Sequence, residues 1–228
     1  LYDDDVKYRF RSDEYRLMAQ EQYAEFLTKK YNPDGSLTID QTEKALKAAW
    51  QYDGKIGFDS RKESLKDATV LINGDFLSDS YSPQRCADGF EFFYTLMENF
   101  YNDIYDWSKT SVADGGLGVE CPMAGGSNFS GDDRSDLFLN AHYDYIARHT
   151  YQSHPNTGTE YKVGTSVSNG GSTLGDIGGN TFSSASFRKV MGLPYIVTES
   201  LIAEPNIHSM EFNLIAAAIY SYQGGSLT

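Results

Sequence analysis

Cysteine is nearly absent from the sequence, and so are long apolar runs. The 228 residues include two cysteines, Cys86 and Cys121, which excludes a disulfide framework and a metal site of four thiolates. We expect both to be buried thiols. No segment approaches the roughly 18 consecutive apolar residues of a transmembrane helix. The N-terminus has no basic region followed by an apolar one, and we expect the chain to begin inside a longer protein.

Basic residues are also scarce. The chain has 19 Lys and Arg against 32 Asp and Glu, a net charge of -13, which disfavours binding to nucleic acid or to an anionic membrane. The glycines at 171, 175 and 178 form no dinucleotide fingerprint, and no P-loop lysine follows them. A neutral partner such as a sugar fits better. The 17 Tyr and 13 Phe suit a cleft lined with rings, although an aromatic core has the same composition.

Helical periodicity dominates the first half of the chain. Ser12 is a predicted N-cap for a helix that ends before the breaker 32–35, and a second helix is predicted from Ile39 to Trp50. A wide apolar stripe from Arg85 to Tyr105 predicts a long core helix. The apolar residues 68–72 fit either a strand or a packed loop segment. Residues 32–43 resemble a calcium loop only superficially, because the glycine falls at the fourth place instead of the sixth.

The second half alternates between apolar runs and helical patterns. Strands are predicted at 117–123, 145–151, 194–199 and 217–222, with helices between them, including short ones at 136–142 and 187–191. This order favours repeated βα units and a parallel sheet. Glu199 ends the third of these strands. A carboxylate at the carboxyl end of a barrel strand is a catalytic candidate, and the alternative is that Glu199 only caps the strand or pairs with a Lys or Arg.

Several polar residues lie near the predicted strand ends. His149 and Tyr151 point the same way on one strand and so could line one pocket. Asn128 follows the small residues 124–127, which leave room for a ligand. Residues 156–186, rich in Gly, Ser and Asn, are predicted to be a long binding loop over the carboxyl face of the sheet. His149 and His154 could suggest a metal, but no third ligand has suitable spacing, and we expect neither a metal nor a cofactor.

Three segments together resemble a known family. They look like strands six, seven and eight of a clan A retaining glycoside hydrolase, with agarase-like and β-galactosidase-like enzymes as the closest members: His149-Thr150-Tyr151 with His154-Pro155, Gly192-Leu193-Pro194-Tyr195-Ile196-Val197-Thr198-Glu199, and Ile219-Tyr220-Ser221-Tyr222-Gln223-Gly224-Gly225. Two further parts of the chain resemble helices of those enzymes: residues 26–31 together with 45–50, and residues 88–101. The resemblance implies an α/β fold, in which residues 1–228 form roughly the C-terminal half, strands five to eight, of a (βα)8 TIM barrel.

The resemblance also implies roles for residues. Glu199 would be the nucleophile of a retaining reaction on a β-linked glycan, and Tyr151 would donate a hydrogen bond to it. Sugar hydroxyls would be bound by four further residues: His149, Asn128, His154 and Gln223. The Trp that relatives often carry near the end of strand eight has no counterpart after Gln223.

The acid of this family is a Glu preceded by Asn on strand four, and no Asn-Glu pair stands at the start of this chain. The N-terminal half of the barrel is therefore expected on another chain or segment. Without it, two open strand edges should make the chain unstable as a monomer. A secreted or periplasmic location is preferred to a cytoplasmic one. Two alternatives stay open: a non-catalytic carbohydrate-binding or scaffold half-barrel, and an unrelated α/β enzyme in which Glu199 is structural.

Overall fold

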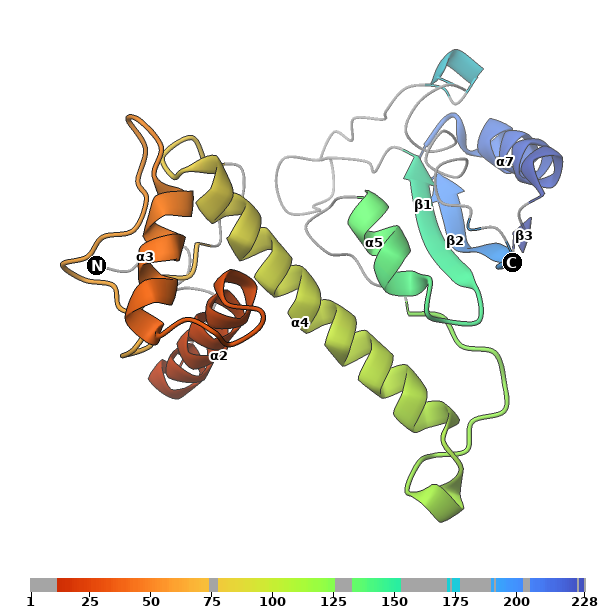
Figure 1. The fold of residues 1–228 in the computed structure, drawn as a ribbon. Coiled ribbons are helices and arrows are strands. Elements are labelled where there is room, and N and C mark those ends of the chain that lie inside the picture. The colour runs from red at the N-terminus through yellow and green to blue at the C-terminus, as the bar shows by residue number, and fades with distance from the viewer. Residues whose placement is uncertain are drawn as a thin grey trace. The chain divides into compact units, whose positions relative to one another are not determined.

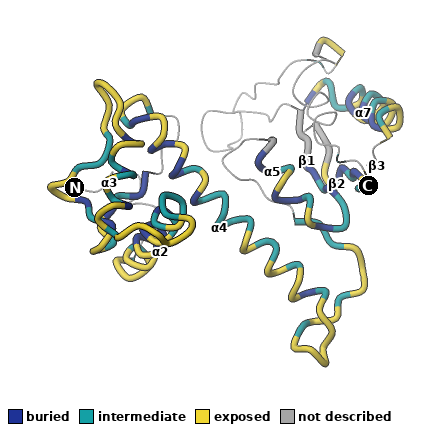
Figure 2. Tube along the Cα trace, in the orientation of Figure 1, coloured by how far each residue is buried: buried dark blue, intermediate teal, exposed yellow. Residues whose placement is uncertain are grey.

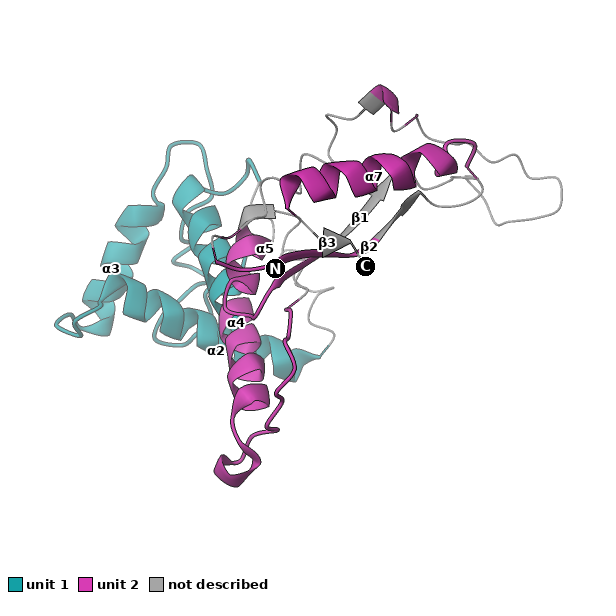
Figure 3. Ribbon diagram, turned by 90° about the vertical axis from the view of Figure 1, so that its right-hand side faces the viewer, with its two compact units in different colours: residues 1–96 teal, residues 97–228 magenta. Residues whose placement is uncertain are grey.

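The computed structural model describes most of the chain in two compact units. The described residues are 12–73, 78–125, 133–152, 172, 174–176, 190, 192–202, 206–224 and 226–227. The units are residues 1–96 and residues 97–228 (Figure 3). The prediction of one barrel portion over residues 1–228 stays a prediction, and each unit is considered by itself.

Unit 1 begins with the two predicted helices. They are α2 (Asp13–Tyr31) and α3 (Ile39–Trp50) (Figure 1). The Ser12 hydroxyl accepts from the backbone N–H of Tyr15 at 3.1 Å, and Thr38 and Gln41 form a reciprocal capping box at the start of α3. These caps satisfy N–H groups that have no partner inside a helix, so both predicted starts are confirmed.

The first part of α4 (Pro83–Lys109) completes unit 1. This is the predicted long helix, and it begins two residues earlier than Arg85. Residues 68–72 form no strand but a packed loop segment, with Val70 and Ile72 buried. The fully or nearly fully buried apolar residues form one core: Ala19, Tyr23, Ala24, Leu27, Leu46, Trp50, Leu65, Val70, Ile72 and Phe92.

Charged side chains are buried beside this core. The Arg85 guanidinium donates to Glu63 at 2.5 and 3.1 Å, to the Leu71 carbonyl at 3.0 Å and to the Gly57 carbonyl. It also lies over the ring of Trp50, 4.7 Å from its centroid. Arg85 thus connects three points of the loop between α3 and α4. The described residues of this loop form no helix and no extended strand.

Unit 2 contains a parallel sheet. Its strands are β1 (Ile146–Gln152), β2 (Tyr195–Ile202) and the short β3 (Ser226–Leu227), in the order β1-β2-β3. Its helices are the end of α4, η1 (Val112–Asp114), α5 (Asp133–Asn140), η2 (Leu174–Asp176) and α7 (Ser209–Gln223). The predicted strands at 145–151 and 194–199 and their parallel pairing are confirmed.

The predicted strand at 217–222 is wrong, because these residues lie in α7. Phe212, Ala216 and Tyr220 recur every four residues and pack with Val197 and Tyr195 of β2. The helix has both buried and exposed residues along its length (Figure 2), and Figure 1 shows its place beside the sheet. A short apolar run does not by itself distinguish a strand from a helix. Here the helix connects β2 to the parallel strand β3, as a βαβ crossover requires.

The predicted strand at 117–123 is also wrong. In the structure this segment has no strand assignment, and its backbone bonds to the end of α4 instead. The N–H groups of Leu117 and Val119 donate to the Trp107 and Ser108 carbonyls at 3.1 and 2.8 Å. Cys121 is exposed, contrary to the expectation of two buried thiols, whereas Cys86 is buried. No helix among the described residues is long and apolar enough to cross a membrane.

Asp144 joins the end of α4 to the segment before α5. Its carboxylate accepts from the Lys109 ammonium, the Met123 backbone N–H and the Tyr105 hydroxyl, each at 2.8 Å. These donors, Lys109 first, lower the pKa of Asp144 from 3.8 to about 2. All of them favour the ionised form.

This network predicts an unusually acidic titration. Because the folded pKa is lower than the unfolded one, the stabilisation from Asp144 is complete above pH 3.8 and is lost as the pH falls through about 2. NMR titration of the Asp144 carboxyl carbon should give a midpoint near 2. Lys109→Met should move it towards 3.8, and Lys109→Arg should move it less. A wild-type midpoint close to 3.8 would show that the network does not form in solution.

Candidate functional site

Glu199 lies in the carboxyl-terminal half of β2, and its side chain is exposed. The strand was predicted to end at this residue, but it continues for three more residues to Ile202. The two preceding residues of odd number, Tyr195 and Val197, are buried against α7 at 4% and 0% exposure. A regular strand, whose side chains alternate between its faces, would place Glu199 on that same buried face. Its exposure therefore needs an explanation.

The explanation is an irregularity in the strand pairing at this point. Arg148 pairs with Val197, but the next residue of β1, His149, pairs with Glu199, so that Thr198 is an extra residue on β2. An extra residue of this kind, a β-bulge, changes the phase of the side chains that follow. We infer that the bulge directs Glu199 away from the face that α7 covers. Bulges occur often beside active sites, where they redirect a side chain.

The strand register also places the residues predicted to assist Glu199. His149 is the direct partner of Glu199, and Tyr151 pairs two residues further on, with Leu201. The sheet thus brings His149 and Glu199 side by side, while Tyr151 lies nearer the carboxyl ends of the strands. For His149 and Tyr151 the structure describes the backbone position. Asn128 and His154 lie outside the described residues.

Gln223 is placed differently from the prediction. It is the last residue of α7, not the residue after a strand. Because α7 connects the carboxyl end of β2 to the start of β3, its own last residue lies towards the amino-terminal edge of the sheet. Glu199 belongs to the other half of β2. Gln223 was expected to bind a sugar hydroxyl because it was placed after the last strand. It does not follow a strand in the structure, so the structure gives this expected role no support.

A carboxylate at the start of α7 was not among the predicted site residues. Glu211 accepts from the Ser172 hydroxyl at 2.6 Å, from the Leu174 N–H at 3.2 Å and from His208 Nδ1 at 2.5 Å. These bonds, that of Ser172 first, lower the pKa of Glu211. They connect Ser172 and Leu174, within the predicted binding loop, to the helix that follows β2. An acidic residue beside the helical spacing of Met210, Leu214 and Ile215 was the available signal.

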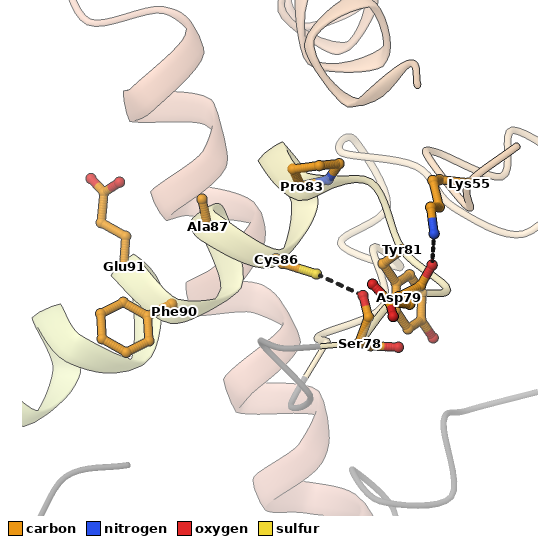
Figure 4. A pocket seen from close by; sticks show the side chains of 9 residues that line it. All are labelled: Lys55, Ser78, Asp79, Tyr81, Pro83, Cys86, Ala87, Phe90 and Glu91. Carbon is orange, nitrogen blue, oxygen red and sulfur yellow. Dashed lines mark hydrogen bonds between the residues drawn. The ribbon is translucent and has the colours of Figure 1, made fainter. Parts of the chain in front are cut away.

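A separate hollow of about 600 Å³ lies in unit 1, between the start of α4 and the segment 78–81 (Figure 4). Phe90 and Tyr81 contribute rings to it, and the Cys86 thiol lies between them, 3.8 Å from the Ser78 carbonyl. Two of its charged groups have protein partners, since Lys55 donates to the Asp79 carbonyl and Glu91 pairs with Lys30. This hollow therefore offers shape and apolar surface more than chemistry.

No group of three or more His, Cys, Asp or Glu side chains in the described part of the chain is placed to hold a metal ion. A single carboxylate such as that of Glu199 can act as a nucleophile, as a general base or as an ion-pair partner.

Comparison with known proteins found no match among protein-family models, curated proteins or solved structures. The interpretation of the site therefore rests on the residues of this chain.

Proposed function

We propose that unit 2 belongs to a retaining glycosidase that cleaves a β-linked glycan, with Glu199 as its nucleophile. The observation that carries this proposal is the bulge in β2, which accompanies an exposed carboxylate where strand alternation predicts a buried side chain. The three parallel strands in sequential order are compatible with a segment of a (βα)8 barrel.

In the proposed reaction, a Glu199 oxygen attacks the anomeric carbon while the bond to the leaving oxygen breaks. A second carboxyl group protonates that oxygen, and it later removes a proton from the water that hydrolyses the glycosyl ester. The second carboxyl, the general acid, is proposed to come from the N-terminal half of the barrel, on another chain or segment. His149, as the register partner of Glu199, is a candidate for contact with the sugar, and Tyr151 for a hydrogen bond to the carboxylate.

Covalent trapping of the intermediate tests this proposal. A 2,4-dinitrophenyl 2-deoxy-2-fluoro-β-galactoside has a leaving group that departs without protonation, so its reaction does not require the general acid. The fluorine destabilises the oxocarbenium-like transition state, and the ester should accumulate. Mass spectrometry of the digested protein is expected to find one fluoroglycosyl group on the peptide that contains Glu199, with an equal amount of dinitrophenolate released.

Glu199→Gln is the matched control, because it keeps the size of the side chain and removes its charge. It should not be labelled. A label on another residue, or a folded chain that is never labelled by the galactoside or the corresponding glucoside, would overturn the proposal. Saturable binding of a β-glycan without labelling would favour the second candidate, a non-catalytic carbohydrate-binding half-barrel.

A further inference from the structure

We infer that Thr198 is a positioning residue, whose hydroxyl holds the bulge that directs Glu199. This inference rests on the proposed function, since it concerns the aim of the same carboxylate. Thr198 is the extra residue of β2, and its Oγ1 donates to the backbone carbonyl of Arg148 on β1, at 3.3 Å. The bond therefore crosses from strand to strand at the point where the regular register changes.

A bulge interrupts the regular ladder of backbone hydrogen bonds and leaves one residue without an opposite partner. The Thr198 hydroxyl adds a bond between the two strands at this point, from a side chain to the Arg148 carbonyl. Thr198 is partly buried, so water competes less for this bond than at an open surface. The hydroxyl thus favours the bulged pairing over a register in which Glu199 would follow Val197 onto the face beneath α7.

The residue that accepts this hydrogen bond is itself anchored. The Arg148 guanidinium bonds to Asp136 of α5 at 3.4 Å, and the two residues are 8% and 1% exposed. This contact fixes β1 against α5 just before the register changes. The bulge is therefore held from both strands, by a hydroxyl from β2 and by an anchored residue on β1.

A simpler role for Thr198 is β-propensity alone, because threonine is favoured in strands. Valine shares this preference and the same branched shape but has no hydroxyl. Serine keeps the hydroxyl and lacks the methyl group. Thr198→Val and Thr198→Ser therefore separate the hydrogen bond from the strand preference.

The experiment measures how fast the dinitrophenyl 2-fluoro-β-galactoside labels the wild-type chain, T198V and T198S. We expect T198V to lower the first-order labelling rate by about 10- to 100-fold, the scale of a misplaced reacting group. The concentration for half-maximal labelling and the melting temperature should change little. T198S should recover most of the rate. Amide hydrogen exchange at residues 148–150 and 198–200 should be about 2- to 10-fold faster in T198V, the factor expected for one lost hydrogen bond.

The possible failures differ from one another. Wild-type labelling rates and wild-type exchange in T198V would overturn the role of Thr198 and leave Glu199 as the nucleophile. An equal loss of rate in T198V and T198S would assign the effect to packing of the methyl group, against the inference. A wild-type chain that is never labelled would overturn the proposed function itself, whatever the exchange data show.

Discussion

Replacing Glu199 by glycine is expected to lower the rate of β-glycoside hydrolysis by about 10⁴-fold or more, the order seen when the nucleophile of a catalytic unit is removed. The side chain is exposed, so the fold should be retained. The assay uses a dinitrophenyl β-galactoside, first with the chain alone and then with a polypeptide proposed to supply the N-terminal half. Circular dichroism checks the fold.

Azide should restore turnover of this substrate by E199G. The small anion can occupy the space of the missing carboxylate, attack the anomeric carbon from that side and displace dinitrophenolate. The product is then an α-glycosyl azide, inverted relative to the substrate. Glu120, an exposed carboxylate elsewhere in unit 2, provides the control, and Glu120→Gly should behave as wild type. Near-normal hydrolysis by E199G would rule out Glu199 as the nucleophile.

Replacing Arg85 by methionine should destabilise unit 1 by roughly 3–5 kcal/mol, the usual cost of removing one partner of a buried ion pair. The side chains of Arg85 and Glu63 are 2% and 0% exposed. Glu63 also accepts from the Asp59 and Leu71 N–H groups at 2.6 and 2.9 Å. Without Arg85 its charge stays buried, and the loop between α3 and α4 loses its main connection to α4.

Trp50 is a convenient probe for this loss, because it is fully buried and lies beneath the Arg85 guanidinium. Urea unfolding followed by tryptophan fluorescence, in a Trp107→Phe background, would report unit 1 by itself. The double variant Arg85→Met/Glu63→Leu should be more stable than Arg85→Met alone, because it removes both charges. Lys29→Met is the surface control, since Lys29 and its partner Glu25 are 81% and 71% exposed; it should cost less than about 1 kcal/mol. A similar small loss in Arg85→Met would contradict the assigned importance of the ion pair.

The helices were the most predictable part of the fold. Ser12 caps its helix as predicted, because capping depends on residues only three positions apart. The second helix begins at Ile39 as predicted, although its Thr38–Gln41 capping box was not foreseen. The strands β1 and β2 were also found, since β-branched runs favour extended structure. The segment 217–222 was mistaken for a strand because its apolar run is short. The packing of Phe212, Ala216 and Tyr220 on the sheet shows that the apolar residues follow the period of a helix.

The candidate site, like the fold, was predictable only in part. Glu199 was identified from its place after an apolar run, and His149 from its place on the neighbouring strand. The pairing of these two residues was not predictable, because register depends on contacts between strands nearly fifty positions apart in the chain. The bond from Ser172 to Glu211 was missed for the same reason, because these residues are 39 positions apart. His208 and Glu211 are only three positions apart, and their contact was simply overlooked.

The sequence by itself determined the acidic charge, the capped helices, two parallel strands and the identity of the candidate carboxylate. These properties follow from composition or from interactions over a few residues. Tertiary structure alone decided that Thr198 is an extra residue in β2, that Gln223 ends a helix, and that Arg85 and Glu63 are buried together. Each of these depends on which distant segment lies opposite. The free energy of such pairings comes from burial and from bonds across the chain, which no local pattern encodes.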